Sequence, residues 1–154
     1  MSAGSYNLLL VDDDSLQIDL ARRAVAESCP EINLIVVGGG DVVLDWFSAS
    51  LEKKEHMPHI VLMDLKLPKL DGLAVLRRLR GFAATCDIPI VVFSAEYTQD
   101  EVQMSYKAGA NSFMDKPTDL ASFTEFFHER LAYWNHPHQR ELVFAAAIKA
   151  KGHN

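Results

Sequence analysis

The sequence predicts an α/β fold, a doubly wound sheet in which five parallel strands alternate with five helices. Short, unbroken apolar runs recur along the chain, as in strands of a parallel sheet covered on both faces. Amphipathic stretches with a helical period separate these runs. The chain has 154 residues, of which 49% are hydrophobic and 23% are charged, and this suits one ordinary globular domain.

The first strand is predicted over Asn7–Val11, and three acids follow it, Asp12–Asp14. A helical pattern over Ser15–Ser28 comes next and ends before Pro30. Asp14 is therefore interpreted as the N-cap of this helix, since exposed amides and the helix dipole favour Asp there. Capping explains one acid of the three.

The second strand is predicted over Asn33–Val37 and a flexible turn at Gly38–Gly40. The three glycines have neither dinucleotide-binding spacing nor a Walker lysine, so a phosphate-cradling loop is not indicated. Asp41 is expected to cap the next helix. The residues of this helix expected to face inward are Val43, Trp46 and Phe47.

The third strand, Ile60–Met63, delivers a single carboxylate, Asp64, at its C-terminal end. In an open α/β sheet this edge is where ligands bind, so Asp64 is a candidate site residue. A loop leads to a helix over Gly72–Arg80. The arginines expected to reach solvent from this helix are Arg77, Arg78 and Arg80.

The fourth strand, Ile90–Phe93, places the hydroxyl of Ser94 at the same edge. The helix after it is predicted over Thr98–Ala108, with Gly109 as its C-cap. A fifth strand over Ser112–Asp115 then leads to the Lys116 ammonium.

The last helix is predicted over Leu120–Trp134, with one apolar stripe that Phe126 and Tyr133 extend sideways. Residues 135–154 form a tail whose apolar run over 141–148 is compatible with a short helix.

Right-handed crossovers arrange the five strands in the flavodoxin-like order 2-1-3-4-5. Strands one and three are then neighbours, which brings Asp12, Asp13 and Asp64 together. The repulsion among these carboxylates is most simply relieved by a bound hard divalent cation with oxygen ligands.

This constellation resembles the receiver domains of two-component response regulators, over residues 6–134. The matching positions are the acid pair Asp12 and Asp13, Asp64 with Pro68 and Gly72 after it, Ser94 followed by Ala95, and Lys116 followed by Pro117. The LPKLDGL and SYKAGANSF segments look most like single-domain regulators that serve phytochrome-type histidine kinases.

The resemblance implies that a histidine kinase transfers a phosphoryl group to Asp64. It further implies a Mg²⁺ ion held directly by Asp13, Asp64 and the backbone carbonyl of Lys66, with Asp12 acting through bound water. Such a protein is a phosphoacceptor with weak self-catalysed phosphorylation and dephosphorylation, and not an enzyme with a separate substrate.

The resemblance also assigns roles to three residues around the phosphoacceptor. Lys116 is expected to pair with a phosphoryl oxygen. Ser94 is expected to hydrogen-bond the phosphoryl group and so bias the rotamer of Phe113. At this switch position Phe113 lacks the hydroxyl of the tyrosine often found in the family.

Two other functions compete with this one. A hydrolase of the aspartyl-phosphate type would share the nucleophile and the cation, but Lys66 stands where such an enzyme keeps its general acid. A pseudo-receiver that only binds partners is disfavoured because every phosphorylation residue is present.

Composition and charge limit the remaining partners. The net charge of −6 argues against direct nucleic-acid binding. No apolar run has membrane-spanning length and the N-terminus lacks a signal region, so a cytoplasmic protein is expected. Cys29 and Cys86 are interpreted as reduced, structural thiols. A homodimer is predicted through Thr98–Trp134 and the tail, since Phe126 and Tyr133 exceed what the core requires.

Overall fold

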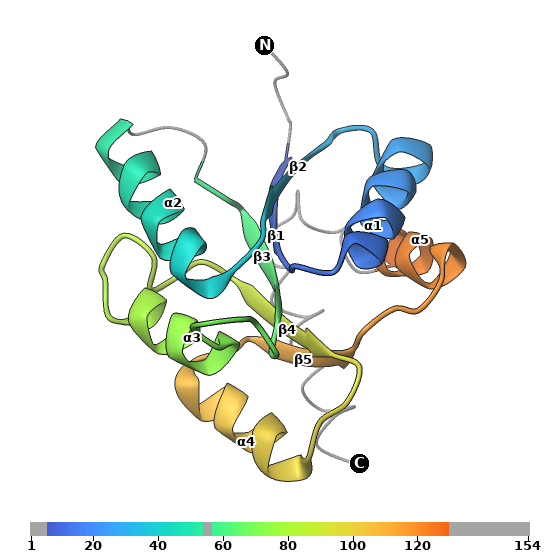
Figure 1. The fold of residues 1–154 in the computed structure, drawn as a ribbon. Coiled ribbons are helices and arrows are strands. Elements are labelled where there is room, and N and C mark those ends of the chain that lie inside the picture. Colours follow the sequence, from blue (N-terminus) through green and yellow to red (C-terminus); the bar gives the residue numbers. More distant parts are fainter. Residues whose placement is uncertain (1–5, 54–56, 130–154) are drawn as a thin grey trace.

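The computed structural model describes residues 6–53 and 57–129. Five parallel strands form one sheet in the order β2-β1-β3-β4-β5, which confirms the predicted flavodoxin-like topology (Figure 1). The strands are β1 (Tyr6–Val11), β2 (Ile32–Val37), β3 (Ile60–Asp64), β4 (Ile90–Ser94) and β5 (Ser112–Asp115). The helices are α1 (Ser15–Ser28), α2 (Gly40–Lys53), α3 (Gly72–Arg80), α4 (Gln99–Ala108) and α5 (Leu120–Glu129).

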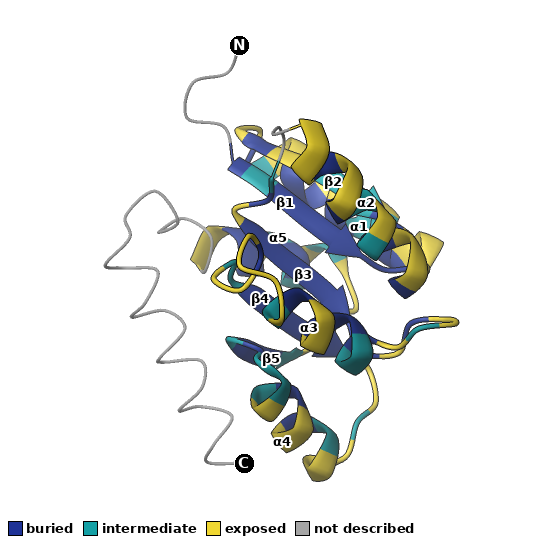
Figure 2. Ribbon diagram, turned by 90° about the vertical axis from the view of Figure 1, so that its left-hand side faces the viewer, coloured by how far each residue is buried: buried dark blue, intermediate teal, exposed yellow. Residues whose placement is uncertain are grey.

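Helices cover both faces of the sheet and create two cores. Helices α1 and α5 pack together on one face, whereas α2, α3 and α4 cover the other (Figure 1). Every residue of β3 and β4 is buried, and Figure 2 shows the sheet as a buried layer between partly exposed helices. The unbroken apolar runs of the sequence therefore match strands covered on both faces.

The strand register places the predicted site residues at one edge of the sheet. Val11 pairs with Met63 across β1 and β3, so the residues that follow them, Asp12 and Asp64, are adjacent. Asp64 in turn pairs with Phe93 of β4, beside Ser94. Parallel strands thus gather residues more than 80 positions apart in sequence at one site.

The turn before α2 differs from the prediction. The helix begins at Gly40, so Asp41 lies in its first turn and is not its N-cap. A Cβ atom at Gly40 would lie 1.9 Å from the Leu70 carbonyl oxygen, which requires glycine here because the backbones are in contact. Trp46 is only partly buried, whereas Val43 and Phe47 face the core as predicted.

The prediction that Arg80 reaches solvent is wrong. Its guanidinium donates to the Gly109 carbonyl at 2.9 Å and to Asn111 Oδ1 at 2.8 Å. It also donates to three carbonyl groups of the loop before β4, those of Thr85, Cys86 and Ile88. Burial lowers the pKa of Arg80, which nevertheless remains a cation and neutralises the carbonyl dipoles around it.

One further expectation changes. Phe126 is buried, 5% exposed, and packs on Phe127, so it adds no exposed apolar surface to α5. Cys29 and Cys86 are both free thiols as predicted, but Cys29 is buried whereas Cys86 is exposed. The predicted end of α5 at Trp134, with Tyr133, and the tail over 135–154 lie outside the described residues.

Within residues 6–53 and 57–129, no helix is long and apolar enough to cross a membrane.

Candidate functional site

Three carboxylates meet at the carboxyl edge of the sheet. One oxygen from each of Asp12, Asp13 and Asp64 lies within 4.8 Å of the others. Asp12 is fully buried and Asp64 is 6% exposed, whereas Asp13 faces solvent. Asp14 is the N-cap of α1 and accepts from the Leu16 amide, as predicted. The acids of this run therefore divide into one cap and two site residues.

Lys116 supplies the cation beside this cluster. Its Nζ lies 3.0 Å from Asp12 Oδ2 and 3.1 Å from Asp64 Oδ2, and its side chain is 9% exposed. Burial alone would lower the pKa of Lys116, but the Asp12 and Asp64 carboxylates outweigh it and the pKa is raised. The ammonium thus contacts two of the three carboxylates, and the cluster keeps an excess of negative charge.

Asp12 is the carboxylate of the cluster whose charged form burial disfavours most clearly. Burial raises its pKa, and the Asp14 amide and the Lys116 ammonium only partly offset the effect. Asp12 Oδ1 accepts from the Asp14 amide at 3.0 Å, but Oδ2 accepts no hydrogen bond of good geometry although Lys116 is near. A buried carboxylate oxygen in this state fits a cluster that holds a hard divalent cation, whose ligands are oxygens.

The loop after β3 is fixed to Asp64 by its backbone. The Lys66 amide donates to Asp64 Oδ1 at 3.1 Å, which holds the carboxylate at the strand end. The Lys66 peptide therefore lies beside the cluster, where the prediction puts its carbonyl group as a metal ligand.

The two predicted switch residues are both buried. Ser94 is 1% exposed, and its hydroxyl donates to the Glu96 carbonyl at 2.9 Å, within its own loop. Phe113 is fully buried, and its ring meets that of Tyr97 edge-on at a centroid distance of 4.7 Å. In this structure Ser94 is thus hydrogen-bonded within its loop, and Phe113 points inward.

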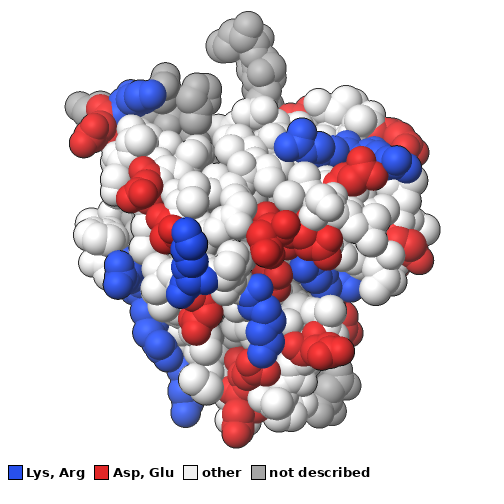
Figure 3. All heavy atoms as spheres, viewed as in Figure 1, with Lys and Arg blue, Asp and Glu red and all other residues white. Residues whose placement is uncertain are grey.

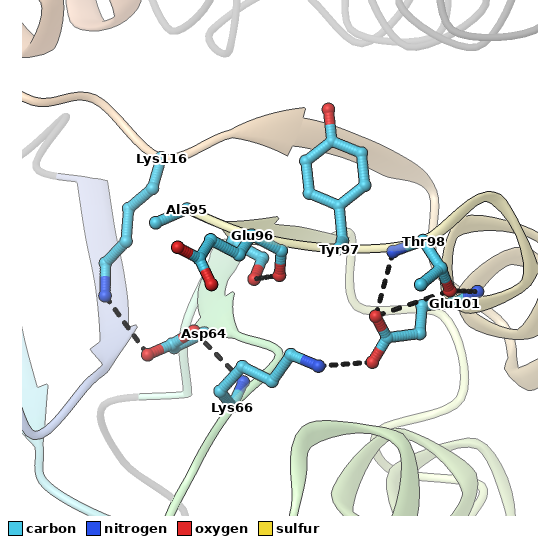
Figure 4. Close-up of a pocket in the computed structure, with 9 residues that line it drawn as sticks. Asp64, Lys66, Ala95, Glu96, Tyr97, Thr98, Glu101 and Lys116 are labelled. Carbon is cyan, nitrogen blue, oxygen red and sulfur yellow. Dashed lines mark hydrogen bonds and ion pairs between the residues drawn. The ribbon is translucent and has the colours of Figure 1, made fainter.

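A cavity of about 630 Å³ opens above Asp64 (Figure 4). Its lining combines predicted site residues with side chains of the loop after β4 and of α4, namely Asp64, Lys66, Ser94, Ala95, Glu96, Tyr97, Thr98, Glu101 and Lys116. The sequence prediction missed Glu96, Tyr97 and Glu101. The site therefore extends from the sheet edge to the first turn of α4.

Glu101 binds two partners at this end of the cavity. Its Oε2 accepts from the Lys66 ammonium, and its Oε1 accepts from the Thr98 amide at 2.9 Å (Figure 4). The pair with Lys66 and the hydrogen bond to Thr98 lower the pKa of Glu101. The Thr98 hydroxyl in turn accepts from the Glu101 amide, so the two residues form a capping box. The spacing Thr-x-x-Glu is the sequence signal that could have identified Glu101.

Charges are mixed around the site. On the face shown in Figure 3, acidic side chains gather near the centre with basic side chains beside them, and further basic side chains lie along the lower left edge.

Comparisons with known proteins found a matching family model and several similar proteins. A family model described as the response regulator receiver domain matches residues 8–127. FilR2 of Methanothrix harundinacea, a probable methanogenesis regulatory protein, is 28% identical over 84% of this chain and 83% of its own length. The response regulator Rcp1 of Synechocystis is 26% identical over 82% of this chain and 87% of its own.

Solved structures show the same fold. The Mn²⁺-bound form of Rcp1 superimposes with a TM-score of 0.73 at 24% identity, over 85% of this chain and 95% of that one. The phosphorylated cyanobacterial phytochrome response regulator RcpA gives a TM-score of 0.76 at 25% identity, over 86% and 96% of the two chains. Other curated relatives are longer, and the chain spans 31% to 47% of their length.

Proposed function

Because the chain belongs to the response regulator receiver family of two-component signal transduction, we propose that it accepts a phosphoryl group on Asp64 from a histidine kinase. One observation supports this most directly. Asp64 ends a buried central strand with Lys116 Nζ at 3.1 Å and the carboxylates of Asp12 and Asp13 within 4.8 Å. A nucleophile, a fixed cation and an oxygen-rich cation site thus meet at one point.

The proposed reaction is an in-line transfer. A carboxylate oxygen of Asp64 attacks phosphorus, the bond from phosphorus to the kinase histidine breaks, and an acyl phosphate forms. Lys116 would hold a phosphoryl oxygen by charge, and Ser94 would turn its hydroxyl from the Glu96 carbonyl toward the new group.

Asp12, Asp13, Asp64 and the Lys66 carbonyl are the groups proposed to hold Mg²⁺. When bound, the ion would neutralise charge on the transferring group. The Mn²⁺-bound state of the similar protein Rcp1 supports a divalent ion, as does the excess of negative charge in this cluster.

Intact-mass spectrometry tests the phosphoacceptor. Incubation with acetyl phosphate and Mg²⁺ should add one phosphoryl group to the wild-type protein, and chelation of the metal should prevent it. Asp64→Asn should abolish the addition because it removes the nucleophilic oxygen. Asp45→Asn, at an exposed position of α2, is the matched control and should be labelled normally. Equal labelling of the Asp64 variant would reject this assignment.

The likeness to Rcp1 and RcpA suggests a phytochrome-type kinase as the partner. A homodimer through Thr98–Trp134 and the tail also remains a proposal. Phe126 is buried and does not support the dimer. The support now comes from α4, where Met104 is 41% exposed. Light scattering at tens of micromolar, roughly where weak interfaces associate, should give twice the chain mass. A monomeric mass with and without acetyl phosphate would reject the dimer.

The hydrolase alternative has less support. Lys66, two residues after Asp64, directs its ammonium to Glu101, so the expected general acid of such an enzyme is replaced by a paired cation.

A further inference from the structure

An ion pair spans the candidate site between the loop after β3 and the first turn of α4. Figure 4 shows the Lys66 side chain reaching away from Asp64 to the Glu101 carboxylate. The backbone amide of the same residue donates to Asp64 Oδ1 at 3.1 Å. Lys66 is therefore attached to the phosphoacceptor by its main chain, while Glu101 holds its ammonium.

The pair borders two cavities. The second cavity, of about 450 Å³, is lined by Asp13, Pro68 and Leu73 among others. The cavity above Asp64 and this second cavity share two lining residues, and these are Lys66 and Glu101. A phosphoryl donor that enters above Asp64 thus meets a cation whose charge is already neutralised.

The contact is easily exchanged. The Lys66 and Glu101 side chains are 55% and 26% exposed, so water and salt screen their attraction, and such pairs are weak. A phosphoryl group carries more negative charge than one carboxylate and offers several acceptor oxygens. It can therefore compete with Glu101 for the ammonium.

We propose that Glu101 is a positioning residue that withholds Lys66 from the phosphoryl site, and that an incoming phosphoryl donor takes the ammonium over from it. This inference rests on the proposed function of Asp64. The exchange moves one ion pair and breaks no covalent bond. The hydrogen bond from the Thr98 amide to Glu101 can persist, so α4 keeps its cap while its link to the loop after β3 is released.

Glu101→Gln removes the charge that binds Lys66 and keeps a side chain that can cap α4. Glutamine at the third position of a helix still completes a capping box, so α4 should stay intact. The experiment measures initial rates of phosphoryl uptake from acetyl phosphate by quenched intact-mass spectrometry, at saturating Mg²⁺. The matched control is Glu96→Gln, which removes another acid that lines the same cavity.

We expect Glu101→Gln to lower the half-saturating acetyl phosphate concentration by about 2- to 5-fold, the range for an exposed ion pair, with an unchanged maximal rate. Glu96→Gln should lower it less. In a protein that already carries Lys66→Met, Glu101→Gln should lower the half-saturating concentration no more than Glu96→Gln does. No ammonium remains there for Glu101 to release.

Three results would overturn the inference while the wild-type protein is labelled at Asp64. They are an unchanged half-saturating concentration in Glu101→Gln, an equal effect of Glu96→Gln, and a full effect that persists without Lys66. A wild-type protein that takes up no phosphate would instead reject the proposed function.

Discussion

Asp13→Asn should make the protein more stable without metal and less stable with it. The substitution keeps the shape of the side chain and removes one of the three charges that folding brings within 4.8 Å. Asp12 and Asp13 are neighbours in the unfolded chain as well, so the repulsion that folding adds to Asp13 comes from Asp64. At this separation it is worth about 1 kcal/mol in water.

The size of both effects follows from the size of the domain. Unfolding of about 120 residues has an entropy of about 0.25 kcal/mol per kelvin, so 1 kcal/mol corresponds to roughly 4 °C in Tm. At a Mg²⁺ concentration 100 times its Kd, binding stabilises the wild-type protein by about 2.7 kcal/mol, or roughly 10 °C. Asp13→Asn should therefore gain about 4 °C in EDTA and lose most of the shift with Mg²⁺.

Thermal unfolding followed by circular dichroism, in EDTA and in a Mg²⁺ series, measures both quantities. Asp45→Asn removes an exposed carboxylate of α2 and should follow the wild-type protein in both conditions. If the Asp13 variant showed the full wild-type shift with Mg²⁺, Asp13 would not be a ligand. If its Tm in EDTA fell, the cluster would not be repulsive in the metal-free protein.

Two further predictions concern groups whose burial decides the outcome. Arg80→Met should lower the free energy of unfolding in urea by about 2–3 kcal/mol because it leaves several partly buried carbonyl groups unpaired. Arg78→Met, at an exposed position, should change it by less than about 0.5 kcal/mol. An equal change in the two variants would show that the hydrogen bonds of Arg80 do not stabilise the fold. Burial raises the pKa of Asp12 in the metal-free folded protein above its value in the unfolded chain. Protonated Asp12 therefore favours the folded state, and this contribution is complete below the unfolded pKa of Asp12. It is lost as the pH rises through the folded pKa of Asp12. In EDTA the wild-type protein should therefore lose stability relative to Asp12→Asn from about pH 4 upward, and parallel curves for the two proteins would contradict this.

The sequence predicted the sheet edge well because each strand carries its own signal. The run before Asp64 is wholly apolar, so the local sequence pattern alone predicts a buried strand that ends in a carboxylate. The order of Asp12, Asp64, Ser94 and Lys116 along the chain then implied their meeting, and the structure brings these residues together. Local pattern and topology agree here, which is why the prediction succeeded.

The failures share a different cause. Arg80 follows two arginines on a helix, and nothing in its neighbourhood indicates that five acceptors from the loop before β4, Gly109 and Asn111 converge on it. The pairing of Glu101 with Lys66 joins residues 35 positions apart, at a distance that only the packing of α4 determines. Phe126 likewise faces a core that α1 completes. Tertiary contacts decide these positions.

Arg80 restrains the C-terminal end of α4. Its guanidinium donates to the carbonyl of Gly109, the C-cap of α4, where a positive φ of 115° and the nearby Arg80 stem leave no room for a side chain. The first turn of α4 is linked to the loop after β3 by the ion pair of Glu101 with Lys66. Ten residues span about 15 Å, so a swing of about 10° around Gly109 would carry the first turn by roughly 2.6 Å while Gly109 stays in place. We therefore expect any movement of α4 that follows release of this ion pair to be larger at its first turn than at Gly109.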